Sequence, residues 1–508
     1  MRYGLVIDNR KCIGCHSCTV VCKTENRVPL GVNRTWVKYV EKGRFPLVRR
    51  VFQVTRCNHC EKPPCVEICP VSAMYRRNDG IVDFNSARCI GCKACMQACP
   101  YDAIYLDPDR NTVAKCHLCA HRVEAGMEPA CVAVCPEHAI TAGNLDDAQS
   151  DISQLLAHEA VRVRKPEQGT KPKVFYIDAD DCTMEPTAAR HELSYMWAQR
   201  NTANGSGAAV YAPGSPFLQK NTLAAYDVAH ARAWDWQVPV YFWTKAIGSG
   251  LLAVPAIGLA LGRMSLNPLR DIVLSTLALI LIAATVVLLV SDLSRRDRFW
   301  KVLTSPQRKS WISKGAFCLV LYSAFCGALL VGTITGHPTL CRFLLWPTVL
   351  AGVGAAGYTA FLFGQCEGRD LWQTPLLPVH LIVQSVLVSA AVLMFLPTSL
   401  GASPRSQALA ITALSITLVL HLLMVAGEVS IPHSTNNAEY GIWLMTRGPY
   451  KKLFWAGAVG IGGILPLLLL FASSVSNIAA GLSGVLALGG LLAFEWCFVM
   501  AGQCVPNS

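Results

Sequence analysis

The apolar residues are not spread evenly along the chain, and their distribution divides it near residue 237. Before this position polar and charged residues predominate. After it, runs of about 20 apolar residues, the length needed to cross a bilayer, dominate the sequence. These runs predict eight transmembrane helices. The expected ranges are 238–261, 272–291, 315–335, 343–366, 375–396, 406–428, 452–472 and 477–502.

An even number of spans places both chain ends on the same side of the membrane. Lys and Arg residues in the short loops indicate which side that is. The loops on the side of the chain ends carry eleven: Arg295, Arg296, Arg298, Lys301, Arg308, Lys309, Lys314, Arg369, Arg447, Lys451 and Lys452. The opposite loops carry four: Arg263, Arg270, Arg342 and Arg405. This excess predicts a bacterial inner (cytoplasmic) membrane protein whose N-terminal part lies in the cytoplasm. The opening MRYGLVIDNRKC agrees, because it lacks the apolar segment of a signal peptide.

The cysteines are concentrated in the polar part, where sixteen of the 23 lie between Cys12 and Cys135 in four groups of four. The groups are Cys12, Cys15, Cys18, Cys22; Cys57, Cys60, Cys65, Cys69; Cys89, Cys92, Cys95, Cys99; and Cys116, Cys119, Cys131, Cys135. The first and third have the C-x2-C-x2-C-x3-C spacing that binds bacterial [4Fe–4S] clusters, and proline follows all but the first. In such a loop three thiolates face one cluster, and Gly14 and Gly91 are expected where the backbone turns tightly beside it.

The last cysteine of each group is expected to reach the other cluster of a pair, as in two-cluster ferredoxins. Pairing the second group with the third, and the first with the fourth, predicts four ligand sets. These are Cys12, Cys15, Cys18, Cys135; Cys116, Cys119, Cys131, Cys22; Cys57, Cys60, Cys65, Cys99; and Cys89, Cys92, Cys95, Cys69. We therefore expect four [4Fe–4S] clusters and no [3Fe–4S] centre. Zinc is the weaker alternative, because it prefers two separated C-x2-C pairs, and disulfides are weaker still.

Three motifs in this part are Cys57-Asn58-His59-Cys60, Pro63-Pro64-Cys65 and Lys115-Cys116-His117-Leu118-Cys119. With the order of the cysteine groups, they make residues 1–180 resemble the four-cluster electron-transfer subunit of the molybdopterin oxidoreductase family, which includes dimethyl sulfoxide, polysulfide and tetrathionate reductases and formate dehydrogenases. The resemblance implies a position between a molybdopterin-containing catalytic subunit and a membrane anchor. No segment resembles the molybdopterin subunit, so substrate chemistry is expected on a separate subunit.

Residues 181–236 are expected to be a linker, and a plain tether is the favoured interpretation. Lys173–Asp178 predicts a short strand just before it, and the Asn, Gly, Ser, Ala and Pro residues of 201–216 predict a loop. Cys182 stands alone and is expected to be inert. The predicted fold is thus an α+β double bacterial-ferredoxin-like domain over 1–180, this linker, and an all-α eight-helix transmembrane bundle over 237–503.

Five ionisable residues fall inside the predicted spans, where they are costly and therefore candidates for function. They are Lys245, His380, His421, Glu428 and Glu495, and Asp292 and Glu367 lie near helix ends. Alternate threading of the helices puts all of them in the half of the membrane nearest the cysteine-rich part. Such a one-sided cluster could exchange protons with a quinone. The alternative is structural: Lys245 and Glu428 could pair or reach the interface, Asp292 and Glu367 could be solvated, and a histidine could bond a backbone group.

The helical part resembles the polysulfide-reductase membrane-subunit (NrfD-like) family through Ser310-Trp-Ile-Ser-Lys-Gly315 and Gly427-Glu428-Val-Ser-Ile-Pro-His433. This resemblance implies an anchor over about residues 235–500 that binds quinone and lacks haem. A haem held by His380 and His421 is the less favoured alternative. Two competing functions stay open: an ion-translocating module driven by electron flow, and a passive anchor without a quinone site.

Composition supports a membrane-bound rather than a nucleic-acid-binding protein. Of the 508 residues, 52% are hydrophobic and only 15% are charged. The net charge of +12 does not predict nucleic-acid binding, because many basic residues flank membrane segments and others are expected near anionic clusters. The expected partners are the lipid bilayer, membrane quinone and the catalytic subunit.

Overall fold

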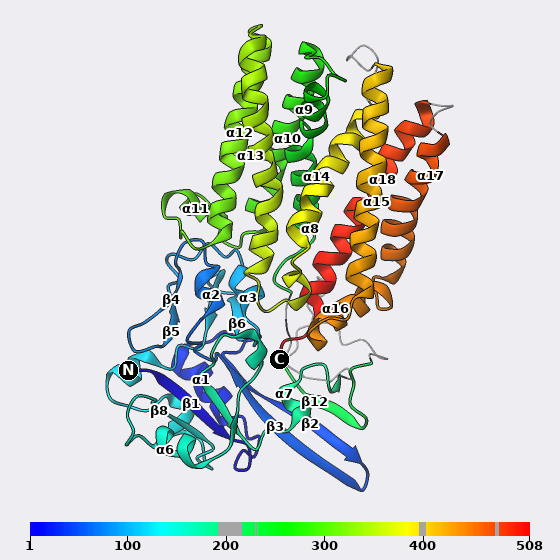
Figure 1. Ribbon diagram of the computed structural model, residues 1–508. Helices are drawn as coiled ribbons and strands as arrows, with labels where there is room; N and C mark the ends of the chain where they lie inside the picture. Colours follow the sequence, from blue (N-terminus) through cyan, green and yellow to red (C-terminus); the bar gives the residue numbers. More distant parts are fainter. Residues whose placement is uncertain (192–215, 229, 231, 396–402, 473–476) are drawn as a thin grey trace.

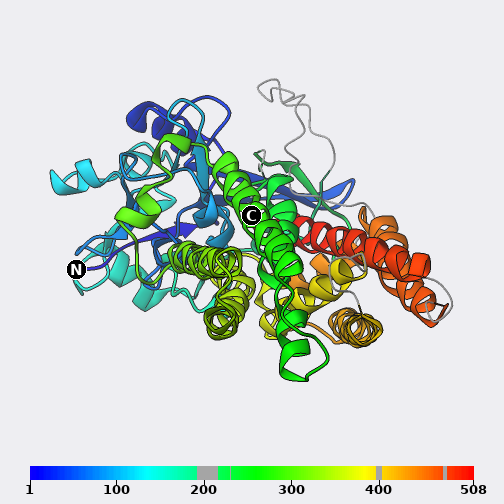
Figure 2. The same ribbon diagram turned by 90° about the horizontal axis from the view of Figure 1, so that it is seen from above.

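The computed structural model describes residues 1–191, 216–228, 230, 232–395, 403–472 and 477–508. It has an N-terminal α+β part and a C-terminal bundle of long helices that stands on it (Figure 1). Viewed along the bundle, the N-terminal part extends beyond the helices on one side (Figure 2). The α+β part followed by apolar helices confirms the predicted fold class.

A four-stranded sheet forms the base of the N-terminal part. Its order is β8 (Ile140–Asn144), β1 (Tyr3–Asp8), β10 (Val174–Ile177), β9 (Val161–Arg162). Strand β1 is central because Leu5, Val6 and Ile7 are all buried, so both of its faces are covered. Strand β10 confirms the short strand predicted at 173–178.

A second sheet shows that the linker is not a plain tether. Strands β2 (Thr35–Arg44) and β3 (Leu47–Arg56) form a long hairpin, and β12 (Thr222–Tyr226) pairs antiparallel with β2. Strand β11 (Arg190–His191) completes this sheet. The tether prediction is therefore wrong for these strands.

The physical reason for this pairing is a small apolar core between the linker and the hairpin. Val40 and Val51 of the hairpin pack there with Ala189, Ala224 and Cys182. The Cys182 side chain is fully buried. The loop predicted at 201–216 lies outside the described residues except for its last position.

Short hairpins and helices make up the rest of the N-terminal part. The hairpins are β4 (Met74–Arg76) with β5 (Val82–Phe84) and β6 (Ile104–Asp107) with β7 (Thr112–Lys115). The helices are α1 (Ser17–Asn26), α2 (Pro64–Glu67), α3 (Ala94–Ala98), α4 (Ala120–Glu124), α5 (Ala130–Ala133), α6 (Asp151–His158) and α7 (Asp181–Met184), with a 3-10 turn at Pro166–Gln168.

The bundle contains the predicted spans. Its helices are α8 (Gln237–Gly250), α9 (Ala253–Ala260), α10 (Pro268–Asp292), α12 (Trp311–Ile334), α13 (Pro338–Gly364), α14 (Leu377–Leu393), α15 (Pro404–Ser430), the π-helix Leu453–Ile464, α17 (Leu465–Ala472) and α18 (Asn477–Cys504). Shorter elements on the side of the N-terminal part are the 3-10 turns Arg296–Arg298 and Asp370–Gln373, α11 (Lys301–Thr304) and α16 (Asn436–Thr446). Among the described residues, seven spans are long and apolar enough to cross a membrane, counting α8–α9 as one. The fifth predicted span is the shorter apolar helix α14.

The first span is broken between α8 and α9, and a side chain of α14 satisfies the broken backbone. Ser389 Oγ donates to the carbonyl of Leu251 at 3.0 Å and accepts from the N–H of Val254 at 3.1 Å. A membrane interior offers no water for such groups, so Ser389 makes the break tolerable.

The two parts are joined by backbone contacts rather than by side chains alone. The N–H groups of Ser294 and Arg295 donate to the carbonyls of Gly91 and Ile90, each at 3.2 Å. The chain end lies at the same junction, where Arg164 donates to the Asn507 carbonyl at 2.7 Å. Both described chain ends are therefore on the same side of the bundle (Figure 1).

Candidate electron-transfer site

The first cysteine of each group is followed by the same backbone turn. The residue two positions later has a positive φ in all four cases: Gly14 (72°), His59 (43°), Gly91 (67°) and Leu118 (56°). This turn points the backbone N–H back at the sulfur. The distances from N to Sγ are 3.5 Å for Cys57, 3.4 Å for Cys89 and 3.4 Å for Cys116. The glycines confirm the tight turns that the sequence predicts, and His59 and Leu118 show that the turn does not require glycine.

The last cysteine of a group receives a different hydrogen bond. The N–H four residues later donates to Cys69 at 3.1 Å and to Cys135 at 3.3 Å. Cys22 lies inside α1, because no proline follows it. There the side chain of Asn26 donates to Cys22 Sγ at 3.6 Å and also reaches Cys119 Sγ at 3.8 Å. N–H donors directed at sulfur stabilise anionic thiolates, so all these bonds suit metal-bound cysteines.

The fold brings the cysteines together across the groups. One cavity is lined by Cys12, Cys15, Cys18 and Cys135. A second cavity is lined by Cys22, Cys116, Cys119 and Cys131. Within the described residues, no three His, Cys, Asp or Glu side chains lie close enough to share a single metal ion. The thiols instead surround spaces that suit a larger group.

The other eight cysteines form two similar sets in more crowded surroundings. Burial raises the pKa of the Cys60 thiol, and the neighbouring thiols of Cys57 and Cys99 raise it further. Burial likewise raises the pKa of the Cys92 thiol, with Cys69 and Cys89 adding to the effect. Cys57 and Cys99 are the cysteines predicted to share a ligand set with Cys60. Cys69 and Cys89 are those predicted to share one with Cys92.

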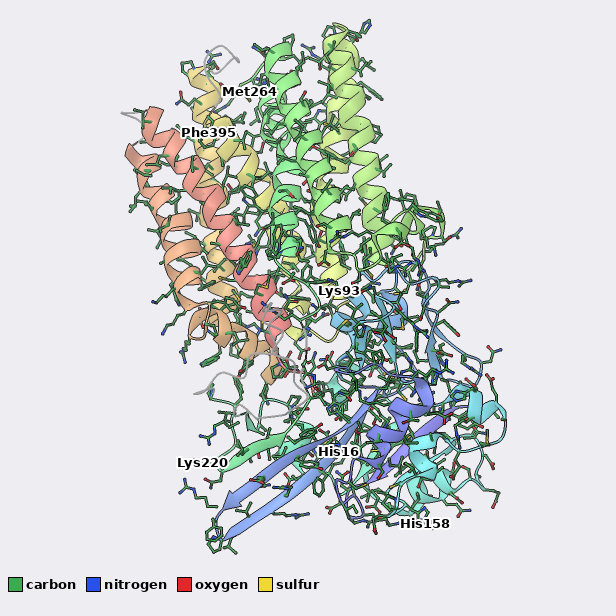
Figure 3. The ribbon with its side chains drawn as sticks, turned by 180° about the vertical axis from the view of Figure 1, so that it is seen from behind. His16, Lys93, His158, Lys220, Met264 and Phe395 are labelled. Carbon is green, nitrogen blue, oxygen red and sulfur yellow. The ribbon has the colours of Figure 1, made fainter. Side chains whose placement is uncertain are left out.

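Electrostatic interactions between thiols of different sets order the four sets in a row. The thiol of Cys18 interacts with that of Cys131, Cys116 with Cys57, and Cys95 with Cys65. The row therefore begins at the set that contains Cys15 and ends at the set that contains Cys92. Cys15 is the exposed end, since it is the one exposed cysteine in the described part of the chain. His16, next to Cys15, lies away from the bundle, whereas Lys93, next to Cys92, lies at the junction (Figure 3).

A group of buried aromatic side chains covers the end of the row nearest the bundle. Trp234 Nε1 donates to the Cys92 carbonyl at 3.1 Å. The Trp234 ring stacks on Trp372, with centroids 5.7 Å apart, and Phe363 lies 4.3 Å from Trp372. Phe242 follows at 4.9 Å from Phe363. The sequence did not predict these residues, because they come from separate segments of the chain and share no distinctive spacing.

Lys245 and Glu495 form one polar group inside the bundle. Lys245 Nζ donates to Thr359 Oγ1 and to the Ala356 carbonyl, and it lies 4.9 Å from the centre of the Phe242 ring. Glu495 is 3% exposed, attracts Lys245, and has no hydrogen-bond partner on either carboxylate oxygen among the described residues. A buried carboxylate of this kind is open to a bond from a ligand or water.

His380 and His421 form the second polar group. One ring nitrogen donates to the other, with His380 Nε2 and His421 Nδ1 2.7 Å apart. Phe494 packs on both rings, at centroid distances of 5.2 and 5.1 Å. Because Phe494 precedes Glu495 on α18, this helix connects the two polar groups.

The remaining candidates lie apart from these groups. Glu428 is half-buried at the end of α15 and accepts from Thr374 Oγ1 at 3.0 Å. Asp292 pairs with Lys93 at 2.9 Å, which ties α10 to the third cysteine group. Burial raises the pKa of Glu367 to about 7, and the nearby Glu67 carboxyl adds to the increase.

Comparisons with known proteins agree with this division into two parts. A 4Fe-4S dicluster domain matches residues 48–145 and another matches residues 11–74. The chain is therefore an iron–sulfur electron-transfer protein fused to a multi-pass membrane domain. The family described as polysulphide reductase, NrfD, matches residues 227–507, so the protein belongs to this family.

Curated relatives match the N-terminal part, and several are named as reductase subunits. A tetrathionate reductase subunit of Salmonella typhimurium is 46% identical over 202 residues, which cover 39% of this chain and 80% of the relative. Protein NrfC of Escherichia coli K12 is 43% identical, covering 35% of this chain and 81% of the relative. A polysulfide reductase subunit of Wolinella succinogenes is 40% identical, covering 35% and 94%.

Proposed function

We propose that this chain carries electrons between a soluble molybdopterin-containing catalytic subunit and quinone in the bacterial inner membrane. The observation that carries the proposal is the row of cysteine sets, which runs from exposed Cys15 to Cys92 at the bundle. Each set would bind one [4Fe–4S] cluster, and four clusters would pass single electrons along the row. The proposed ligands are the four sets of cysteines predicted from the sequence.

The surroundings of the thiols fit such clusters. The loops direct backbone N–H groups at sulfur, and each of two sets lines one cavity. The direct bond from Trp234 to the Cys92 backbone makes the end of the row continuous with the interior of the bundle. The protein would thereby hold the last cluster at a fixed distance from the membrane.

We place the quinone site at the two polar groups of the bundle. Lys245 lies eight residues after the first residue of α8, and Glu495 lies nine residues before the last residue of α18, which is about 12–14 Å along each helix. Quinone reduction consumes two protons per two electrons, and the Glu495 carboxyl group and the His380–His421 pair could relay these protons to the quinone. Glu428 lies seven residues beyond His421, about 10 Å closer to the side of the N-terminal part. It is the proposed point of proton entry.

The geometry of the histidine pair supports proton transfer rather than haem ligation. An iron between two ring nitrogens would need two metal–nitrogen bonds of about 2 Å each. His380 Nε2 and His421 Nδ1 are only 2.7 Å apart and already share a hydrogen. We therefore propose an anchor without haem.

The partner and the sidedness are proposed from the relatives and from charge. The relatives are named as subunits of tetrathionate and polysulfide reductases, so a separate catalytic subunit would meet the exposed end at Cys15. The excess of basic residues on that side of the bundle supports a cytoplasmic location.

The test is the rate at which a soluble short-chain quinone reoxidises the dithionite-reduced, detergent-purified chain. Glu495→Gln and His421→Asn should each slow reoxidation by about tenfold or more, because each removes a proton donor or acceptor. His337→Gln is the matched control, since His337 is exposed at the far end of α13. Unchanged rates in both variants, with all four cluster signals present, would refute the proposed quinone site.

A further inference from the structure

A basic residue stands immediately before the first cysteine of every group. The four are Lys11, Arg56, Arg88 and Lys115. Lys11 and Arg88 are exposed, whereas Arg56 is 1% exposed and Lys115 is fully buried. The four basic residues therefore have two different environments, and only Arg56 and Lys115 place a cation inside the protein.

Arg56 ends strand β3 and points into the second cysteine cavity. Its Nη1 donates to Cys131 Sγ at 3.0 Å. It lines this cavity together with Cys22, Cys116 and Cys119. Its Nε and Nη2 have no hydrogen-bond partner among the described residues.

Arg56 has thiols where a buried arginine usually has a carboxylate. The charged groups that act on it most strongly are Cys131, Cys18 and Cys116. A buried guanidinium costs several kcal/mol unless an anion compensates it. A cluster with four thiolates carries about −2 when oxidised and about −3 when reduced, so it would supply that anion.

Lys115 differs from Arg56 in how it is satisfied. Its Nζ donates to the carbonyls of Val82 and Cys116, the second at 3.0 Å. Backbone oxygens thus accept from its ammonium group, whereas two of the Arg56 nitrogens have no partner among the described residues. Arg56 is therefore the residue that combines a direct hydrogen bond to a thiol of this set with unpaired donors.

We propose that Arg56 raises the reduction potential of the cluster held by Cys22, Cys116, Cys119 and Cys131, and so makes this second position in the row favourable for an electron. The inference rests on the proposed four-cluster arrangement. A fixed positive charge with directed N–H groups stabilises the more negative, reduced cluster. Arg56 would act only through its positive charge beside the cluster, and it takes no part in substrate chemistry.

The test is a potentiometric titration of the membrane-purified chain followed by electron paramagnetic resonance. Arg56→Gln keeps a hydrogen-bonding group but removes the charge, and Arg56→Lys keeps the charge. Arg88→Gln is the matched control, because Arg88 has the same position before the third group but is exposed. A Cys131→Ser variant identifies which of the signals belongs to the second cluster.

The expected result is a shift of that signal to lower potential in Arg56→Gln, with wild-type potentials in Arg88→Gln and nearly wild-type potentials in Arg56→Lys. An unshifted signal in Arg56→Gln, with iron content equal to wild type, would overturn the proposal. If the Arg56→Gln variant does not bind the cluster, the Arg56→Lys variant provides the test. A lowered reduction potential in Arg56→Lys, which retains the charge, would overturn the proposal, and a wild-type potential would support it. The iron content of the wild-type chain separately tests the four-cluster arrangement, so the two failures can be told apart.

Discussion

His230 offers a quantitative test of how the linker is fixed to the cysteine-rich part. Its Nδ1 contacts the Asp102 carboxylate, three residues after Cys99, and its Nε2 lies 3.4 Å from Asp227 Oδ1. Burial alone would lower the pKa of His230, but the two carboxylates outweigh it and raise the pKa to about 10. The perturbation is His230→Gln, which keeps polarity and removes the charge.

The expected loss of stability follows from proton linkage. The histidine pKa rises from 6.5 to about 10 on folding, so the protonated ring stabilises the folded state. The contribution is complete below about pH 6.5, is at most about 4 kcal/mol at pH 7, and disappears as the pH rises through about 10. The measured loss should be smaller, because Asp227 retains Lys38 as a neighbour at 3.6 Å.

The assay is the thermal denaturation midpoint of the detergent-purified chain at pH 7 and near pH 10. His230→Gln should lower the midpoint by roughly 5 °C at pH 7 and by much less near pH 10. His158→Gln, at the exposed end of α6, is the control and should have little effect at either pH. Equal losses at the two pH values would refute the reasoning, because the ion pair would then not depend on the charge of His230.

Two further predictions concern the backbone. Gly91→Ala should destabilise the loop of the third cysteine group and lower the iron content, because the new Cβ would lie 2.7 Å from Ser294 Cβ. Gly126→Ala is the control: Gly126 has a similar φ of 75°, but a Cβ there would meet no other atom within contact distance. It should therefore cost only the backbone strain of about 1 kcal/mol. Ser389→Ala should lower the thermal midpoint by the equivalent of about 1–3 kcal/mol by leaving two backbone groups of the broken first span without partners. Ser291→Ala, which removes only a bond within its own helix, should cost less; equal losses in the two serine variants would contradict the second prediction.

The fold was largely predictable because its strongest signals are local in sequence. Runs of apolar residues define the membrane helices, and the cysteine spacing defines iron–sulfur loops without reference to distant residues. The break between α8 and α9 was not predictable. Leu251 and Leu252 continue the apolar run, and the serine that satisfies the break comes from another helix.

The candidate site was predictable in composition but not in arrangement. Lys245, Glu495, His380 and His421 were identified because charged and polar groups are rare in spans. Their separation into two groups depends on helix packing, which periodicity does not determine. Trp234 had no signal at all, since its role rests on one hydrogen bond to the Cys92 backbone, far away in sequence.

The junction also gives a second cause for the excess of basic residues on one side of the bundle. Arg298 and Lys301 donate to the carbonyls of Cys89 and Ala87, and Arg369 donates to Gln97, so these three hold the bundle on the third cysteine group. Contacts with the iron–sulfur part therefore require basic residues at positions where the membrane orientation of the bundle would also favour them. Arg295 also donates to the N-terminal part, at the Arg110 carbonyl. Removing these four from the eleven leaves seven against four on the opposite side, an excess that docking does not explain. The proposed cytoplasmic location of the iron–sulfur part rests on this remaining excess.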